Sequence, residues 1–210
     1  MSLETLKQYI EEDRLIRNNW FGTDEQGRQT ACLYAALVGN DRPPECPSSV
    51  MPRWLAYLTP WIDDAGSAEK WPAMVRRYAD LAGRWHVLTE EQWHRAEYKF
   101  RKECVLESMK HTTNEVVLAA CRTVIALLDR EIAGDSPTKD EWTVAAAAAW
   151  AAEAAAQRRA RAAAEAAAWA AEAAARAEAA WTAWAAWAAA ADRLTEKLFE
   201  ILEGEIGGKK

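Results

Sequence analysis

The sequence has no run of basic residues and no long hydrophobic segment. Its 210 residues include 26 Lys and Arg against 32 Asp and Glu, a net charge of −6, so we do not expect it to bind bulk nucleic acid through charge. The longest uncharged stretch, residues 179–191, has 13 residues, whereas a membrane-spanning helix needs roughly 18. The first residues include several acids, where a secretory signal would be basic and then apolar. We therefore expect a cytoplasmic protein that does not enter a membrane.

Common catalytic and cofactor-binding motifs are also missing. There is no Walker loop, no GxGxxG, no HExxH and no GxSxG. The four cysteines, Cys32, Cys46, Cys104 and Cys121, form no CxxC pair and have no histidine at zinc-finger spacing. We expect free thiols, no bound metal, no cofactor and no enzymatic activity.

Helix signals recur along the first two thirds of the chain. Apolar residues fall at spacings of three and four, and the period-two alternation that marks strands is absent. Prolines, glycines and capping residues divide this pattern into segments. The predicted caps are Ser2, Thr89 with Gln92, and Thr112 with Glu115 at helix starts, and Gly39 and Gly134 at helix ends. The predicted helices span residues 3–18, 30–38, 53–58, 69–81, 89–110 and 112–133, and the predicted loops span residues 21–28, 40–52 and 61–67. The sequence thus predicts an all-α fold in which residues 1–136 form a multi-helix globular domain.

The last third of the chain is an Ala/Trp-rich segment. Ala fills 32 of the 47 positions from 145 to 191, and residues 138–203 contain no Gly or Pro. Thr138 and Glu141 have the spacing of a capping box, and a continuous helix would measure roughly 100 Å. We expect residues 137–210 to form one very long helix or a helical hairpin. The alternative is a low-complexity expansion that the protein merely tolerates.

The tryptophans of this segment do not lie on one helix face. On a helical projection Trp181 lies nearly opposite the charged face, whereas Trp150 and Trp169 flank that face. Indole rings are too large and apolar to be left in water, so several neighbours must cover them. These neighbours could be the N-terminal helices, a folded-back half of the segment, or other subunits. We expect a homo-oligomer joined partly through residues 142–202.

A locally basic and aromatic region supplies the candidate ligand site. Residues 76–111 contain eight Lys or Arg against six acids, interleaved with aromatic residues. Arginine forks bind phosphate and aromatic faces stack on bases, which is what a small anionic nucleotide requires. The candidate ligand-binding residues are Trp61, Arg76, Arg77, Arg84, Trp85 and His86. The alternative is that these charges coat the outside of an aromatic core.

A metal site is a further alternative. Asp63 and Asp64, with His86 and His94 downstream, have the ligand types of a carboxylate and imidazole site. An Asp pair followed by Ala-Gly-Ser is more typical of a turn, in which the side chains bond their own backbone.

One long motif resembles a known group of proteins. The run CPSSVMPRWLAYLTPWIDDAGS, followed by WPAMVRRYADLAGRWHVL and the Lys110-His111-Thr112 triplet, is similar to uncharacterised proteins of tailed bacteriophages and prophages. The resemblance covers residues 32–113 and extends in style to the Ala/Trp-rich helix. It implies a phage accessory protein in the cytoplasm of an infected bacterial host cell, and it supplies no catalytic residue.

The resemblance suggests a function only by analogy. Phage accessory proteins of this kind are often counter-defence factors, which bind a host immune protein or sequester a small nucleotide immune signal. We therefore expect a non-enzymatic binding protein. The alternatives are a structural or scaffold protein of the phage and a metal-dependent nucleotide hydrolase.

Overall fold

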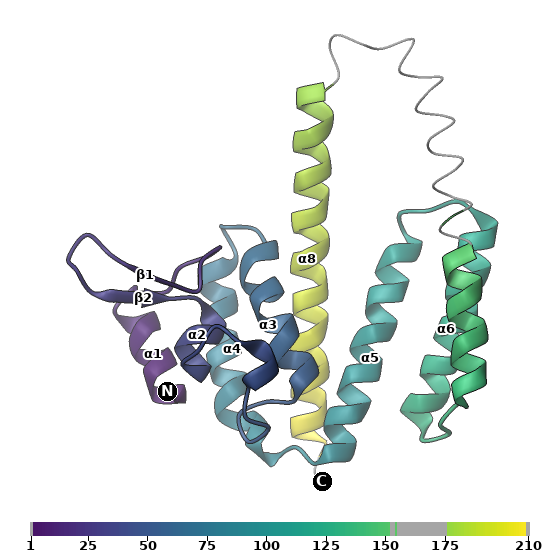
Figure 1. Cartoon of the computed structure of the whole chain (residues 1–210), viewed down its shortest axis with the longest axis horizontal. Helices are drawn as coiled ribbons and strands as arrows, with labels where there is room; N and C mark the ends of the chain where they lie inside the picture. The colour runs from purple at the N-terminus through teal and green to yellow at the C-terminus, as the bar shows by residue number, and fades with distance from the viewer. Residues whose placement is uncertain (1, 152–153, 155–175, 209–210) are drawn as a thin grey trace. The chain divides into compact units, whose positions relative to one another are not determined.

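The computed structural model describes residues 2–151, 154 and 176–208, and helices dominate it (Figure 1). They are α1 (Leu3–Glu11), α2 (Leu33–Val38), α3 (Arg53–Ala65), α4 (Trp71–Arg84), α5 (Glu90–Met109), α6 (Glu115–Ala133) and α8 (Arg176–Gly207). Residues 139–151 are also helical, and η1 (Pro43–Glu45) and η2 (Trp85–Val87) are short 3-10 turns. The predicted all-α class is confirmed. In the part of the chain described here, no helix is long and apolar enough to cross a membrane.

The chain divides into two compact units. The first combines Met1–Ala96 with Trp187–Lys210, and the second is Glu97–Ala186. The last turns of α8 therefore belong with the N-terminal helices. This grouping differs from a division at residue 136, because α8 contacts α4 and the turn before it through residues 125 and 126 positions apart in the sequence.

A small β-hairpin stands where the sequence predicts a loop and the start of a helix. Strands β1 (Phe21–Thr23) and β2 (Gln29–Ala31) pair antiparallel, with Gly22 opposite Thr30. Asp24 holds the turn by accepting hydrogen bonds from the backbone N–H groups of Gln26 and Arg28. The prediction that a helix begins at Thr30 is therefore wrong. Strands of three residues are too short for an alternating pattern to show in the sequence.

The helices on either side of the hairpin are shorter than expected. The first ends at Glu11 rather than near Asn18, and both Asp13 and Asn18 adopt left-handed backbone conformations that a helix cannot contain. Helix α2 begins at Leu33, with Cys32 as its N-cap. Its expected end at Gly39 is confirmed, because Gly39 takes the left-handed conformation of a C-cap.

Helix α3 continues through Pro60, although the sequence predicts that it stops before this proline. It ends at Ala65, so Asp63 and Asp64 are helical and the predicted turn at 61–67 is wrong for most of its length. Proline inside a helix removes one backbone hydrogen bond and costs about 3 kcal/mol. The extra turn buries Ile62 and Asp63, and this tertiary packing outweighs the local preference.

Arg17 stabilises the end of α3. Its Nε donates to the carbonyl oxygen of Asp63 at 2.8 Å, and its Nη2 donates to those of Asp64 and Gly66 at 2.7 and 2.6 Å. These carbonyls have no partner within the helix, and a guanidinium also suits the negative end of the helix dipole. A residue 46 to 49 positions upstream thus provides the C-cap.

The core of the first unit is built around Tyr78. Its ring packs edge-on against Trp85 and Phe199, at centroid distances of 5.5 and 6.3 Å, and its hydroxyl lies 2.7 Å from Thr59 Oγ1. Leu198 and Phe199 of α8 are buried in this unit. In Figure 1 the last turns of α8 run beside α4 and α3. This packing positions one face of α8 against α4.

The second unit confirms some predicted caps and corrects one. Gly134 ends α6 in the left-handed conformation, and Thr138 and Glu141 exchange capping-box hydrogen bonds before residues 139–151. Helix α6 begins at Glu115, but its N-cap is Asn114 rather than Thr112. The expected very long helix or hairpin falls partly on residues 152–153 and 155–175, which lie outside the described residues, as does Trp169. Within the expected segment, residues 139–151 and α8 are helical.

Candidate functional site

The structure assigns Arg77 a partner that the sequence does not suggest. Its Nε and Nη2 each donate to Glu203 at 3.0 Å, and its Nη1 donates to Glu196 at 2.6 Å. These hydrogen bonds raise the pKa of the Arg77 guanidinium, and the same contact lowers the pKa of Glu203. The guanidinium also stands over the Phe199 ring, 5.3 Å from its centroid. Its charge and most of its donors are therefore already used within the protein.

The other five candidate residues have separate surroundings. Trp85 is buried between Tyr78 and Trp93, Arg84 pairs with Asp80 one turn earlier, and His86 is exposed in η2. Trp61 is half-buried on α3. Arg76 is exposed and borders a small cavity beside Tyr9 and Val75, which Arg77 does not line. Adjacent residues on a helix point about 100° apart, which explains why the two arginines line different cavities.

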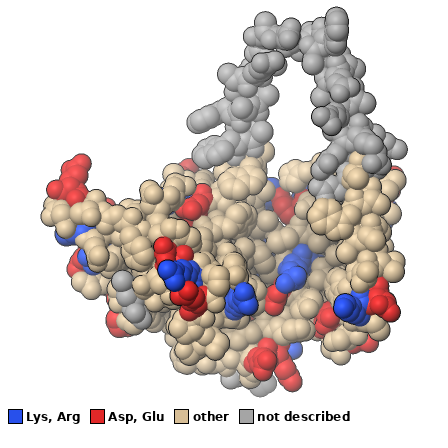
Figure 2. Space-filling view, in the orientation of Figure 1, with Lys and Arg blue, Asp and Glu red and all other residues tan. Residues whose placement is uncertain are grey.

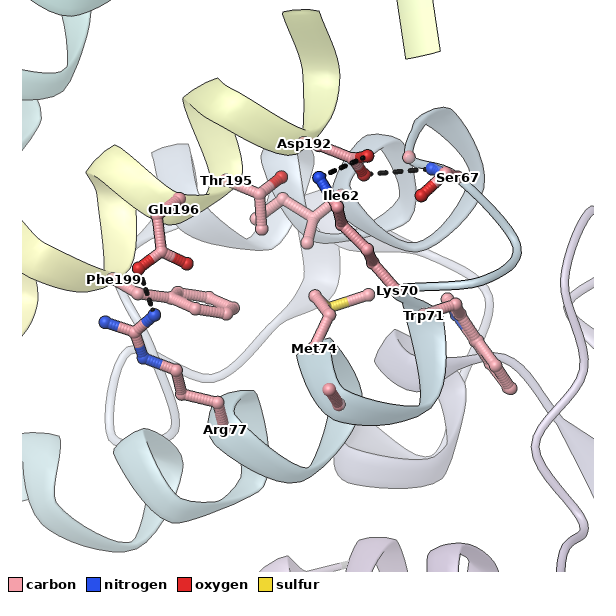
Figure 3. Close-up of a pocket in the computed structure, with 12 residues that line it drawn as sticks. Ile62, Ser67, Lys70, Trp71, Met74, Arg77, Asp192, Thr195, Glu196 and Phe199 are labelled. Carbon is pink, nitrogen blue, oxygen red and sulfur yellow. Dashed lines mark hydrogen bonds and ion pairs between the residues drawn. The ribbon is translucent and has the colours of Figure 1, made fainter. Parts of the chain in front are cut away.

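A hollow of the first unit lies between α4 and α8, and we call it the α4–α8 hollow (Figure 3). It encloses about 210 Å³. From α8, residues Asp192, Thr195, Glu196 and Phe199 reach it at spacings of three and four, and α4 with its preceding turn contributes Ser67, Lys70, Trp71, Ala73, Met74 and Arg77. Ile62 of α3 and Gly66 complete the lining. Apolar side chains form much of the wall, and charged groups of both signs stand around it.

Asp192 is the most sheltered charge of this hollow. Its carboxylate accepts a hydrogen bond from the Ser67 N–H at 2.9 Å and pairs with Lys70 Nζ at 3.4 Å. The Asp192 side chain is only 12% exposed, whereas that of Lys70 is 70% exposed. Gly66 allows the close approach, since a Cβ at that position would lie 2.6 Å from Asp192 Oδ1. The hydroxyl oxygen of Ser67 is buried here and has no hydrogen-bond partner.

The charges that line the hollow are balanced. Among the described lining residues, Lys70 and Arg77 are the two cations and Asp192 and Glu196 are the two carboxylates, while Glu203, which pairs with Arg77, lies outside the lining. Figure 2 shows the same mixing on the face in view, where blue and red side chains stand close together instead of forming a large patch of one sign. A site of this kind does not concentrate anions by its field.

The carboxylates considered for a metal site have structural partners. Asp63 is fully buried, and its two oxygens accept hydrogen bonds from the Leu33 N–H at 2.9 Å and from Trp71 Nε1 at 2.7 Å. Asp64 accepts from the Asn18 N–H at 2.6 Å. Both border a hollow of about 190 Å³ beside Trp20 and Cys32. Among the described residues, no three His, Cys, Asp or Glu side chains come together as a metal site would require.

Sequence reasoning did not find Asp192, Glu196 and Phe199 as site residues. A signal was present, because Asp192, Thr195, Glu196 and Phe199 share one face of a helix, and Lys70, Met74 and Arg77 share another. The sequence does not show that α4 and α8, which lie so far apart in the chain, face each other. No known protein family, curated protein or solved structure matches the chain.

Proposed function

We propose that this chain is a non-enzymatic binding protein whose target is another protein. The observation that carries the proposal is the α4–α8 hollow, which combines apolar walls formed by Ile62, Met74 and Phe199 with charges of both signs. Protein interfaces often place one anchoring side chain of the partner in such a pocket and surround it with polar contacts. The resemblance to phage proteins suggests a host immune protein as the target and counter-defence as the biological role.

The state of Arg77 supports a protein target over a nucleotide. A phosphate group would have to displace Glu203 and Glu196 from the guanidinium, and the displaced carboxylates would remain beside the new anion. Like charges brought together in this way oppose binding. The hollow, at about 210 Å³, is also smaller than the 300 to 1,000 Å³ of common small-molecule sites. It has the size for one side chain.

The polar groups of the hollow support binding without catalysis. Asp192 is held by Ser67 and Lys70, and Glu196 by Arg77. The hydroxyl groups of Ser67 and Thr195 line the wall, but none of the lining residues is a histidine that could activate them as a general base. We therefore assign these groups to recognition.

Filling the hollow should abolish binding of the partner. Ala73 is exposed and lines the hollow, so Ala73→Trp would occupy it from the rim. We expect a protein copurified from producing bacterial cells to bind the purified wild type in calorimetry and to lose at least tenfold in affinity for Ala73→Trp. Lys7→Trp, which introduces the same side chain on the exposed surface of α1, is the control and should bind normally.

The same calorimeter tests the nucleotide alternatives. Cyclic and ADP-ribose-type nucleotides should give no heat and should remain intact in the presence of divalent metal. Saturable heat would favour sequestration of a nucleotide signal, and breakdown of the nucleotide would favour a hydrolase. Either result contradicts the proposal.

We also propose that the chain forms a homo-oligomer through its Ala/Trp-rich part. Large apolar side chains remain exposed there, with Trp150 70% and Trp187 48% accessible. Light scattering at tens of micromolar protein should report a molar mass of more than one subunit, and Trp150→Glu should reduce this molar mass. Ala148→Glu adds the same charge to another exposed face of that helix and should have less effect. A strictly monomeric wild type would contradict the expectation.

A further inference from the structure

We propose that the α4–α8 hollow binds an alkylammonium group, supplied by a lysine side chain of the protein partner. The inference rests on the proposed function and adds the chemistry by which the partner is recognised. Two features carry it: a sheltered carboxylate with a replaceable counter-ion, and apolar walls in the same hollow.

The sheltered carboxylate is that of Asp192. The Ser67 N–H fixes the position of this carboxylate, and glycine at position 66 leaves room for it to approach the backbone. Little of the Asp192 side chain is exposed to solvent. Its counter-ion is the ammonium of Lys70, which approaches only to 3.4 Å from a largely exposed side chain. Because the Lys70 side chain is largely exposed, its ammonium can move into water when another ammonium takes its place beside Asp192. Its present position marks a place where an ammonium group fits.

The walls suit the aliphatic part of a lysine. Ile62, Met74 and Phe199 line the hollow from α3, α4 and α8; in Figure 3 Ile62 lies next to the pair of Asp192 and Lys70, and Phe199 lies beside Arg77 and Glu196. Lysine side chains commonly bury their methylene groups along such surfaces while the ammonium remains with polar groups. A carboxylate at one side of an apolar hollow therefore matches both ends of the side chain.

The remaining polar groups favour a donor over an acceptor. An ammonium carries three N–H donors and no acceptor. Asp192 can accept one of them at the carboxylate oxygen that now pairs with Lys70, and a carboxylate has no hydrogen to donate to an acceptor. Because Arg77 is committed to Glu203 and Glu196, displacing Lys70 leaves the carboxylate of Asp192 without a counter-ion, and an added cation would replace that counter-ion. An added anion would meet Asp192 as a like charge.

The preference can be measured with small probes on the full chain. We would titrate butylammonium, butanol and butanoate, which share an alkyl stem, and follow the methyl signal of Met74 by NMR. Butylammonium should shift this signal saturably in the millimolar range. Butanol should bind at least threefold more weakly, and butanoate should not bind.

Two variants should act in opposite directions. Asp192→Asn keeps an acceptor for the Ser67 N–H but removes the charge, and it should weaken butylammonium binding about tenfold. Lys70→Ala removes the competing ammonium and should strengthen binding about threefold. Asp80→Asn, an exposed acid on α4 that does not line the hollow, is the control and should change nothing.

Three results would overturn the inference. They are tighter binding of butanoate than of butylammonium, weaker butylammonium binding in Lys70→Ala than in the wild type, or no shift of the Met74 signal with butylammonium in the wild type and in Lys70→Ala. None of them depends on the partner. If any one of them occurs while Ala73→Trp still abolishes binding of the partner protein, the hollow binds that protein through another chemistry. If butylammonium binds as expected but Ala73→Trp does not affect the partner, the ammonium site stands and the proposed function fails.

Discussion

Phe199→Ala is expected to lower the free energy of unfolding by about 3 to 5 kcal/mol. The Phe199 side chain is 2% exposed, packs edge-on against Tyr78 and lies under the Arg77 guanidinium. Its removal loses the transfer free energy of a large apolar group and leaves a cavity next to an existing hollow. Urea denaturation of the wild type and the variant, followed by circular dichroism, measures the difference.

The matched control is Phe21→Ala. Phe21 lies on β1 and is 41% exposed, so the same chemical change should cost less than about 1 kcal/mol there. A loss below about 1 kcal/mol for Phe199→Ala as well would mean that α8 does not pack into the core of the first unit. In that case the α4–α8 hollow would not exist as described.

Local capping signals could be predicted from the sequence because both partners lie within a few residues. Thr89 and Gln92 exchange the expected capping-box hydrogen bonds before α5, and Ser2 accepts from the Thr5 N–H at the start of α1. Gly39 and Gly134 end their helices in the left-handed conformation that glycine adopts without strain. In each case the residues that form the cap lie within one helical turn of each other.

The wrongly predicted helix and loop boundaries have a common physical cause. Contacts between residues far apart in the sequence outweigh the local conformational preference of the chain. Arg17 caps α3 across 46 to 49 residues, and the helix continues past Pro60 to bury Ile62. The hairpin depends on pairing between two strands that are each too short to show a pattern. None of these contacts leaves a signal at its own position in the sequence.

The candidate site shows the same limit. The sequence identified Arg77 as a group able to bind a carboxylate or phosphate, and the guanidinium does bind carboxylates. It could not reveal that those carboxylates come from Glu196 and Glu203, 119 and 126 positions away. The aromatic ring of Trp85 is suited to stacking on a ligand, but burial against Tyr78 and Trp93 uses that ring in the core. Residue type indicated the chemistry, and only the fold determined the partner.

Asp63 should make the stability of the protein fall as the pH rises from about 4 to about 6. Burial raises the pKa of its carboxyl from 3.8 to about 6, against the opposing effect of hydrogen bonds from Leu33 and Trp71. The folded protein therefore holds this proton more tightly than the unfolded chain does. The resulting stabilisation is fully present below about pH 3.8 and is lost as the pH rises through about 6. Its size is about 3 kcal/mol, at 1.36 kcal/mol for each pH unit.

Comparison with Asp63→Asn isolates this contribution from the rest of the titration. The pKa values of Asp24, Glu141 and Glu203 are lowered in the folded state, so their stabilisation is lost as the pH falls and works in the opposite direction. They are present in both proteins and cancel in the difference. The amide in Asp63→Asn can accept only one of the two hydrogen bonds. Because this amide does not titrate, the stability lost through the missing hydrogen bond is the same at every pH. Urea denaturation from pH 4 to pH 7 should therefore show that the advantage of the wild type over Asp63→Asn shrinks by about 3 kcal/mol as the pH rises. An advantage that stays constant or grows would mean that the two hydrogen bonds stabilise the ionised carboxylate more than burial destabilises it.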